Sequence, residues 1–419
     1  MNDLVNTQLV SRIGQFPKDW RITKIGEIAS VTKLAGFEFT EHITYKDDGE
    51  IIALRALNLK KGKLDLSDVK RIDKSVSEGL MRSKLFKDDI VFSYVGTIGE
   101  VANIEEDDKY HLAPNVAKIV VNKKYDSKYV TYYLVSQNAN KEIERLLTTS
   151  SQPALSMGNI REIQIPIPPL VEQQKIASIL STWDKAIELK EKLIEQKKEQ
   201  QKGLMQKLLT GKVRLSNFNG EWRETKLGEI GKFLKGKGIS KNETVEKGIN
   251  CIRYGEIYTS HHFYIKEFYS FITKEVAHKS TKIIKNDLLF AGSGETAEEI
   301  GKAVAYLGND EGYAGGDIII LRPTMDVDSL FLSYMVNTGT VAFERARLGQ
   351  GHSVVHIYPS NLANLKILLP PIDEQKQIAD LLKQFDKNID LIEQEVNEIR
   401  MQKKGLMQLL LTGKIRMQV

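Results

Sequence analysis

The chain has 419 residues, which is too many for one ordinary hydrophobic core, so at least two domains are expected. Its composition, 41% hydrophobic and 27% charged, is typical of a globular protein. No apolar run approaches the roughly 18 residues of a membrane span, and residues 1–20 show no secretory signal. The single cysteine, Cys251, excludes an internal disulfide and a thiolate zinc cluster and favours the reducing cytoplasm. A net charge of +5 permits a nucleic-acid partner but does not establish one, because the basic groups must also cluster on one face.

The first part of the chain is typical of a mixed α/β body. Short apolar runs separated by turns rich in Gly and Asp predict β-strands at 50–54, 89–95 and 117–121, and a helical stretch follows near 127–146. The second half has a similar run at 317–321 and a helical stretch near 328–347. We expect each body to be a small curled sheet with flanking helices.

The two halves are related by an internal repeat with a constant offset of 202 residues. Residues 221–230 (EWRETKLGEI) match residues 19–28 (DWRITKIGEI). Residues 168–215 align without a gap on residues 370–417, and 24 of the 48 positions are identical. The bodies between these matched segments barely resemble each other. The chain is therefore two tandem copies of one unit, in which the tails share a common role and the bodies have diverged.

Each tail is predicted to be a long helix. A Pro-Pro pair precedes each helix, and Gly211 and Gly413 mark the two ends. Apolar residues recur with 4,3 spacing over five heptads, which indicates a coiled coil. The first seam comprises Ile176, Leu180, Trp183, Ile187, Ile194, Leu204 and Leu208, and the second comprises Ile378, Leu382, Phe385, Ile389, Ile392, Val396, Ile399, Leu406 and Leu410. About 38 helical residues at ~1.5 Å each would span roughly 55 to 60 Å.

We expect the two seams to pack against each other. The alternative is that each helix belongs to a separate dimer or lies on the surface of its own domain. Polar residues interrupt the seams at Lys190, Lys197, Gln201 and Lys403, where they would set the register. Gly203 and Gly405 are kept in both copies despite their cost in a helix, which suggests a close helix approach or partner docking.

Catalytic motifs are incomplete. Gly231–Lys237 has the spacing of a phosphate-binding loop, but Gly238 stands where Ser or Thr should hold magnesium, so we expect a flexible basic loop. Phe290–Gly294 resembles the F-x-G-x-G motif of adenine methyltransferases that bind S-adenosylmethionine, yet their D/N/S-P-P-aromatic motif is missing, and a strand ending in a glycine turn is favoured. The carboxylate clusters at 105–108 and 295–299 lack the companion Lys or His of a nuclease or metal site. No catalytic or metal site is visible.

Polar, aromatic and basic loop residues remain, and their placement on two diverged bodies favours DNA. Arg, Asn and Gln are the side chains that contact guanine and adenine edges, and Lys suits phosphates. For any single residue, a solvated surface position is the simpler interpretation. The candidates in the first copy are Arg55, Asn58, Lys60, Lys61, Lys63, Tyr94, Thr97, Ser151 and Gln152. Those in the second copy are Lys235, Lys237, Lys241, Arg253, Tyr254, Ser293, Arg347, Gln350 and His352.

These motifs together resemble a known family. The P-P-x-x-E-Q-x-x-I-A-x-x-L segments at 168–180 and 370–382, the L-x-T-G-K endings and the repeated W-R-x-T-K-[IL]-G-E-I openings are similar to those of the specificity subunits of Type I restriction-modification systems. The resemblance covers nearly the whole chain. The second copy has Gly292-Ser293-Gly294-Glu295 where the first has the family-like glycine turn Val95-Gly96-Thr97-Ile98-Gly99.

The resemblance implies an α+β fold with two α/β target-recognition domains in tandem and two long helices paired as an antiparallel coiled coil. The domains would be 1–165 and 216–367, and the helical spacers 166–215 and 368–419. Each domain would bind one half of a bipartite target in double-stranded DNA, and the helices would set the spacer and dock two modification subunits. Restriction subunits would join this cytoplasmic complex. The chain itself would hold no cofactor, and S-adenosylmethionine, ATP and Mg would be bound by the partner subunits.

Two other classes of function remain open. A self-sufficient DNA methyltransferase or nuclease would use 290–294 as its cofactor loop and would bind S-adenosylmethionine without partners. A coiled-coil adaptor that never contacts DNA would show no preference for a bipartite duplex.

Overall fold

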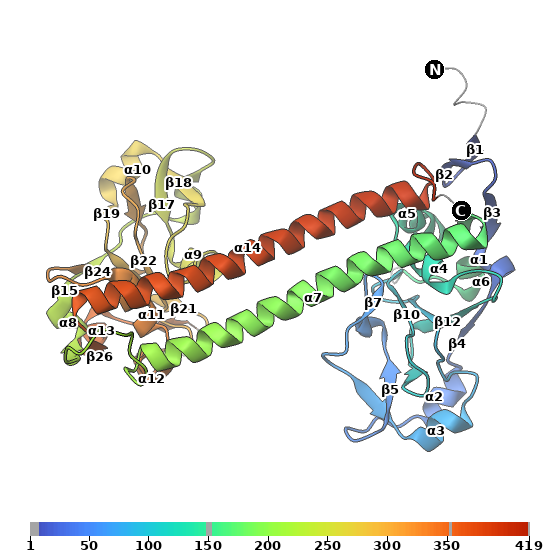
Figure 1. Ribbon diagram of the computed structural model, residues 1–419, viewed down its shortest axis with the longest axis horizontal. Coiled ribbons are helices and arrows are strands. Elements are labelled where there is room, and N and C mark those ends of the chain that lie inside the picture. The colour runs from blue at the N-terminus through green and yellow to red at the C-terminus, as the bar shows by residue number, and fades with distance from the viewer. Residues whose placement is uncertain (1–7, 148–152, 352–353, 418–419) are drawn as a thin grey trace. The chain divides into compact units, whose positions relative to one another are not determined.

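The computed structural model describes residues 8–147, 153–351 and 354–417, and it divides into two compact units (Figure 1). Unit 1 comprises Met1–Glu191 and Gln394–Val419, and unit 2 comprises Lys192–Glu393. Each unit therefore combines one body with the start of the long helix that follows it and the end of the other long helix.

The body of unit 1 contains two main sheets rather than the single sheet that we expected. The four-stranded antiparallel sheet has the order β10-β9-β12-β4, with β4 (Ala29–Lys33), β9 (Ile90–Ser93), β10 (Val101–Asn103) and β12 (Val116–Val121). The three-stranded sheet has the order β11-β5-β8, with β5 (Ile51–Leu54), β8 (Lys70–Ile72) and β11 (Tyr110–Leu112). Three small antiparallel pairs are β1 (Gln8–Ser11) with β2 (Gly14–Pro17), β6 (Leu59–Lys60) with β7 (Lys63–Leu64), and β3 (Arg21–Lys24) with β13 (Gln164–Ile167). The short helices are α1 (Ile25–Ile28), α2 (Gly36–His42), η2 (Ala56–Asn58), α3 (Lys74–Gly79), α4 (Ser127–Leu134), α5 (Gln137–Leu146) and α6 (Met157–Glu162).

Unit 2 repeats the order of the main strands and helices, with differences in its small strands. Its four-stranded sheet has the order β15-β24-β20-β22, with β15 (Gly231–Lys235), β20 (Leu288–Ala291), β22 (Ala303–Ala305) and β24 (Ile318–Pro323). Its second sheet has five strands in the order β16-β18-β17-β23-β19, with β16 (Thr244–Val245), β17 (Ile249–Ile252), β18 (Ser270–Ile272), β19 (Thr281–Ile283) and β23 (Gly312–Ala314). The small pairs are β14 (Arg223–Lys226) with β26 (Lys366–Leu369) and β21 (Ser293–Gly294) with β25 (Val355–His356). The short helices are α8 (Leu227–Ile230), η3 (Lys241–Glu243), α9 (Tyr254–Thr259), α10 (Lys274–Lys279), α11 (Ser329–Val336), α12 (Gly339–Arg347) and α13 (Pro359–Ala363).

The central strand of each body is buried on both faces. In unit 1, Ile90 and Phe92 of β9 pack in one apolar cluster with α4, whereas Val91 packs in a second cluster toward β5 and β11. Alternate residues of a strand point to opposite faces, so one continuous apolar run joins two layers. The segments 127–146 and 328–347 are each two helices instead of one, and in unit 1 Ser136 caps the second helix by accepting from the Ala139 N–H at 3.3 Å.

The structure shows what the two glycine-containing motifs of the second copy, at 231–237 and 290–294, form. The segment that we expected to be a flexible basic loop forms the edge strand β15, which pairs with β24 from Gly231 to Lys235. Phe233 and Leu234 are half-buried there, whereas Lys232 and Lys235 are exposed, as suits an edge strand with one side in solvent. The segment Phe290–Gly294 contains the end of β20, which confirms the predicted strand end, but after a bend at Gly292 the chain continues as the short strand β21 instead of the predicted glycine turn.

The long helices are α7 (Leu170–Leu208) and α14 (Ile372–Leu411), coloured green and red in Figure 1. Within each unit they run antiparallel, as the ion pair Lys190–Glu395 in unit 1 and the ion pair Lys198–Glu393 in unit 2 indicate, together with the Gln201–Asp386 hydrogen bond in unit 2. All sixteen predicted seam residues are buried or half-buried. Both helices end before a glycine with positive φ, Gly211 at 68° and Gly413 at 66°.

A buried glutamate explains why the P-P-x-x-E-Q motif, the Trp-Arg opening and the T-G-K ending are repeated together. In unit 1, Glu172 is fully buried at the start of α7. Arg416, just beyond the end of α14, donates to its Oε1 from Nε at 2.8 Å and to its Oε2 from Nη2 at 2.9 Å. Trp20 Nε1 donates to Oε2 at 3.3 Å. These hydrogen bonds compensate the buried carboxylate.

Unit 2 contains the same joint. Arg214, just beyond the end of α7, donates to Glu374 from Nε at 3.0 Å and from Nη2 at 2.6 Å, and Trp222 Nε1 donates at 3.2 Å. The tail of each long helix is therefore fixed to the start of the other one, and the repeated letters have a structural role. Gly203 and Gly405 do not mark a close helix approach, because a Cβ at either position would meet no atom within 4 Å.

Candidate nucleic-acid interface

Each unit has one pair of parallel strands whose carboxyl ends lie at the same edge of the body. β5 pairs with β11 in unit 1, and β17 pairs with β23 in unit 2. The segments that follow the first strand of each pair begin with Arg55 and Arg253. We call this edge the carboxyl-end edge of the unit. Loops at the carboxyl ends of parallel strands are where α/β proteins commonly place their ligand contacts.

Tyr94 lies at the carboxyl-end edge of unit 1. Its N–H donates to the carbonyl of Asn115, which follows β11, at 3.0 Å, and the Nζ of Lys33, at the end of β4, lies 5.7 Å from the centre of its ring. Burial raises the pKa of the Tyr94 phenol, so it is a protonated hydrogen-bond donor at neutral pH. A basic side chain over an aromatic ring at a loop edge suits contact with a base or a phosphate.

The remaining unit 1 candidates near Tyr94 are on loops. Thr97 is exposed, and its carbonyl accepts a hydrogen bond from the Ser93 hydroxyl, which fixes the turn. Ser151 and Gln152 lie outside the described residues. The chain resumes beside this edge, where Ala154 forms a β-bridge with Val95.

Arg55 and Asn58 have structural roles in unit 1. Asn58 is fully buried, and its Nδ2 donates to the carbonyls of Asp65 and Asp68 at 2.9 and 2.7 Å. Its Oδ1 accepts from the N–H of Arg55 at 3.1 Å. The Arg55 guanidinium donates to the Asp68 carbonyl at 2.8 Å and lies 3.2 Å from its carboxylate. In this structure their polar groups therefore hold the loop after β5, and their assignment as base-contacting residues stays a prediction.

The three lysines of the β6–β7 hairpin lie near the long helices instead of beside Tyr94. Lys60 is exposed and forms an ion pair with Asp65, and the N–H of Lys61 donates to Glu100. Lys63 Nζ lies 3.7 Å from Asp184 of α7. Lys61 has an exposed side chain that could meet a phosphate, whereas the ammonium groups of Lys60 and Lys63 each lie beside a carboxylate.

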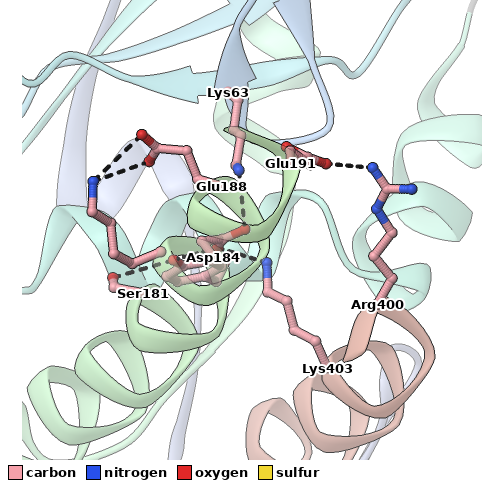
Figure 2. A network of polar contacts seen from close by, with 9 residues as sticks. Lys63, Ser181, Asp184, Glu188, Glu191, Arg400 and Lys403 are labelled. Carbon is pink, nitrogen blue, oxygen red and sulfur yellow. Dashed lines mark hydrogen bonds and ion pairs between the residues drawn. The ribbon is translucent and has the colours of Figure 1, made fainter. Parts of the chain in front are cut away.

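Figure 2 shows this helix contact in unit 1, where Asp184 is the central acceptor. Lys403 of α14 donates to its Oδ2 at 2.6 Å, and the Tyr132 hydroxyl of α4 donates to the same oxygen at 2.8 Å. Arg400 forms a second ion pair across the helices with Glu191. Charges on both helices and on the body thus meet at one half-buried carboxylate, which ties the hairpin to the coiled coil.

The equivalent carboxylate in unit 2 is Asp386. It accepts from the Tyr334 hydroxyl and, at 2.7 Å, from Gln201 Nε2. Gln201 stands where unit 1 has Lys403, so no cation forms an ion pair with Asp386 among the described residues. Burial raises the pKa of Asp386. Asp184 and Asp386 therefore occupy equivalent positions in the two units, but within the described ranges only Asp184 has a cationic partner on the other helix.

The carboxyl-end edge of unit 2 is more basic than that of unit 1. Lys235, Lys237 and Lys241 are all exposed, and Lys237 donates its N–H to the carbonyl of Ala314 at the end of β23 at 3.2 Å. Arg253 is half-buried and follows β17 directly, and Tyr254 beside it is 39% exposed. The structure therefore brings Lys235, Lys237, Arg253 and Tyr254 to one edge, whereas Lys241 lies in η3.

Ser293 and Gln350 lie together on the β21–β25 pair. Ser293 is buried, and its hydroxyl lies 2.9 Å from His356 Nδ1, while its carbonyl accepts from the Tyr258 hydroxyl at 3.0 Å. Gln350 is exposed and exchanges two backbone hydrogen bonds with His356. Arg347 is exposed, with its guanidinium 5.8 Å from the Phe343 ring, and His352 lies outside the described residues.

Sequence reasoning missed several side chains near these edges. Lys33 could have been found, because the offset of 202 places it opposite Lys235. His356 and Tyr258 carry no sequence signal, since their contacts with Ser293 depend on strand pairing far along the chain. Arg345 is 4% exposed, and burial lowers the pKa of its guanidinium to about 10. It replaces Ile143 of the first copy, which no local pattern explains.

Two pairs of buried polar side chains lie close together elsewhere in unit 1. In unit 1 His111 is fully buried with Nδ1 3.0 Å from the Ser77 hydroxyl, and burial lowers its pKa to about 4. Glu38 accepts from the Ser83 hydroxyl at 2.7 Å nearby. Among the described residues, no three His, Cys, Asp or Glu side chains gather closely enough to hold a metal ion. No helix in the described ranges is both long and apolar enough to cross a membrane.

The comparisons with known proteins agree with one another. The family model described as "Type I restriction modification DNA specificity domain" matches residues 17–198 and again residues 219–401. A putative type I restriction enzyme MjaX specificity subunit from Methanocaldococcus jannaschii is 26% identical over 97% of this chain and 96% of its own length. The type I restriction enzyme StySPI specificity subunit from Salmonella potsdam is 22% identical over 96% of this chain and 90% of its own length.

Solved structures show the same fold. The crystal structure of a Type-I restriction-modification system S subunit from M. genitalium matches with a TM-score of 0.59 and 17% identity, over 93% of this chain and 96% of that one. A chain from a structure of the type I R-M system, solved to explain complex assembly and conformational transition, matches with a TM-score of 0.55 and 15% identity, over 96% and 99% of the two chains.

Proposed function

Because the chain belongs to the family of Type I restriction modification DNA specificity domains, with two matched copies, we propose that units 1 and 2 each contact one half of a bipartite DNA target. The chain is a Type I specificity subunit with two tandem DNA-recognition domains. Two further questions are which surface of each unit contacts DNA and which subunits bind to the chain. We assign DNA contact to the carboxyl-end edge of each unit.

One observation carries this assignment. The two units share the order of their main strands and helices and the same joint at Glu172 and Glu374, but they differ at the carboxyl-end edge. Unit 1 presents Tyr94 and Lys33 there, and unit 2 presents Arg253 with exposed lysines. Two different half-sites require different base-contacting side chains on the same fold. Base contacts specify a sequence, whereas phosphate contacts only position the protein.

The helices would hold the two recognition domains apart and provide the docking surface for modification subunits. A continuous helix of 39 residues is about 58 Å long at ~1.5 Å per residue, which exceeds one DNA turn of ~34 Å. We assign S-adenosylmethionine to two modification subunits that methylate adenine in each half-site, and ATP and Mg to restriction subunits. In this assignment the chain acts in the cytoplasm and catalyses no step itself.

A gel-shift titration at several salt concentrations tests the proposal. The chain, assembled with its modification subunits, is expected to prefer one bipartite duplex over a scrambled duplex of the same composition by 1,000-fold or more, the order typical of specific DNA binders. Equal binding to both duplexes would contradict the proposal and favour an adaptor. Calorimetry of the chain alone with S-adenosylmethionine tests the other alternative, because a self-sufficient methyltransferase would release heat on binding.

A further inference from the structure

The arginine that follows the first parallel strand occupies the same place in both units, but only one of the two guanidinium groups is engaged. In unit 1 the Arg55 guanidinium binds the carbonyl and the carboxylate of Asp68. In unit 2 the Arg253 guanidinium makes no hydrogen bond or ion pair with any residue in the described ranges. The Nε of Arg253 is buried without a partner, and so is the Nε of Arg55, so the two arginines differ in their Nη groups, of which only those of Arg55 are engaged. A buried polar atom without a partner is costly, and the whole guanidinium of Arg253 is available for a ligand that satisfies it.

The backbone of Arg253 is fixed although its guanidinium is free. Its N–H donates to Glu256 Oε2 at 2.7 Å, and the other oxygen of this buried carboxylate accepts from the Ser270 hydroxyl at 2.5 Å. The side chain therefore projects from a rigid position at the end of β17. A planar guanidinium on a fixed base is suited to two parallel hydrogen bonds with one partner.

The surroundings of Arg253 form a shallow edge of backbone with lysines around it. Gly315 donates to the Ile252 carbonyl at 2.9 Å, and Gly316 donates to the Gly238 carbonyl at 2.7 Å, so two glycine-containing segments lie beside the arginine. A Cβ at Gly236 would stand 1.9 Å from the Gly315 carbonyl oxygen, so no side chain fits between these segments. Between the exposed lysines the edge is therefore formed by glycine-containing backbone, which allows close approach of a partner such as a duplex.

We propose that Arg253 contacts a guanine in the half-site of unit 2 through the O6 and N7 atoms in the major groove, and that Arg55 makes no equivalent contact in unit 1. This inference rests on the proposed DNA-binding function and adds a specificity-determining residue to it. The exposed lysines at 235, 237 and 241 supply phosphate contacts, whereas the fixed fork of Arg253 supplies geometry that a lysine lacks. In unit 1, Asp68 binds the Arg55 guanidinium, so other side chains contact the half-site of unit 1.

The test measures binding of the full chain with its modification subunits to duplexes that carry the genomic target. Exchange of residues 216–367 first identifies the half-site that belongs to unit 2. Each guanine of that half-site is then replaced by 7-deazaguanine, which lacks the N7 acceptor. The wild-type complex is expected to lose about fivefold or more in affinity at one guanine. Arg253→Ala and Arg253→Lys should each remove that discrimination, because neither side chain can form the bidentate pair.

Several outcomes separate this inference from the function on which it rests. Arg55→Ala is the matched control and should leave base preference unchanged in both half-sites. If Arg253→Lys keeps full discrimination, or if Arg253→Ala weakens binding equally on all sequences, the residue contacts phosphate and the inference is wrong. A half-site without guanine would also overturn it. If the wild-type complex shows no preference for any bipartite duplex, the proposed function itself fails. Thermal unfolding of each variant establishes that it is folded.

Discussion

Removing Arg416 should destabilise unit 1 selectively, because the substitution leaves a buried carboxylate without its cation. Glu172 is fully buried and receives hydrogen bonds from Arg416, from Trp20 and from the N–H of Met417. Breaking a buried ion pair by removing one partner typically costs about 3–5 kcal/mol. The Arg416 side chain is 42% exposed, so water can replace part of the interaction, and we expect a loss of about 2–4 kcal/mol.

The assay is urea unfolding followed by tryptophan fluorescence in a Trp222→Phe background, in which the remaining tryptophans, Trp20 and Trp183, both report on unit 1. With a slope of about 2–3 kcal/mol per molar urea, Arg416→Ala should lower the midpoint by about 1 M. Lys414→Ala is the matched control, because it removes an exposed charge from the same tail. Equal midpoints for the two variants would refute the reasoning that the tail is anchored through Glu172.

Three further predictions concern charge and pH. Gln201→Lys should stabilise unit 2 by about 1 kcal/mol at pH 7, since burial raises the pKa of Asp386 and its partners are neutral; a lower urea midpoint would contradict this. The pKa of buried His111 is about 4 in the folded chain and 6.5 when unfolded, so the unfolded state binds the proton more tightly. The free energy of unfolding should therefore fall by ~1.4 kcal/mol for each pH unit as the pH is lowered from 6.5 to 4. His111→Gln should remove this part of the slope, which pH-dependent urea titrations measure. Replacing the lysines at 235, 237 and 241 by Ala should flatten the dependence of log K on log salt by up to about 2.7 without altering the preferred sequence, whereas Lys247→Ala, at the opposite end of β17, should leave it unchanged.

The repeat and the helices could be predicted from the sequence because their physical signals are local. Heptad spacing indicated the seams from Ile176 to Leu208 and from Ile378 to Leu410, and every seam residue is buried or half-buried. The offset of 202 predicted two copies, and the structure gives them the same order of main strands and helices. The ends of the long helices could be predicted from Gly211 and Gly413, because glycine readily adopts the left-handed conformation that ends a helix and other residues rarely do.

The candidate site was harder to predict because its contacts are long-range. Asn58 carries the right chemistry for an adenine edge, yet it caps its own loop and is fully buried. Ser293 and His356 are 63 positions apart and meet only because β21 pairs with β25. The difference between Arg55 and Arg253 depends on one carboxylate, Asp68, that pairs with the Arg55 guanidinium, whereas among the described residues no carboxylate pairs with the guanidinium of Arg253. Residue type alone does not distinguish these cases.

The central claim is that each unit specifies one half of a bipartite target. It is tested most directly by mapping methyladenine across the genome of cells that carry this chain with its modification subunits, before and after residues 16–165 are replaced by the same segment of a relative. The account predicts a bipartite motif in which the exchange changes one half and leaves the other half and the spacer intact. A change in both halves, or in neither, would contradict it.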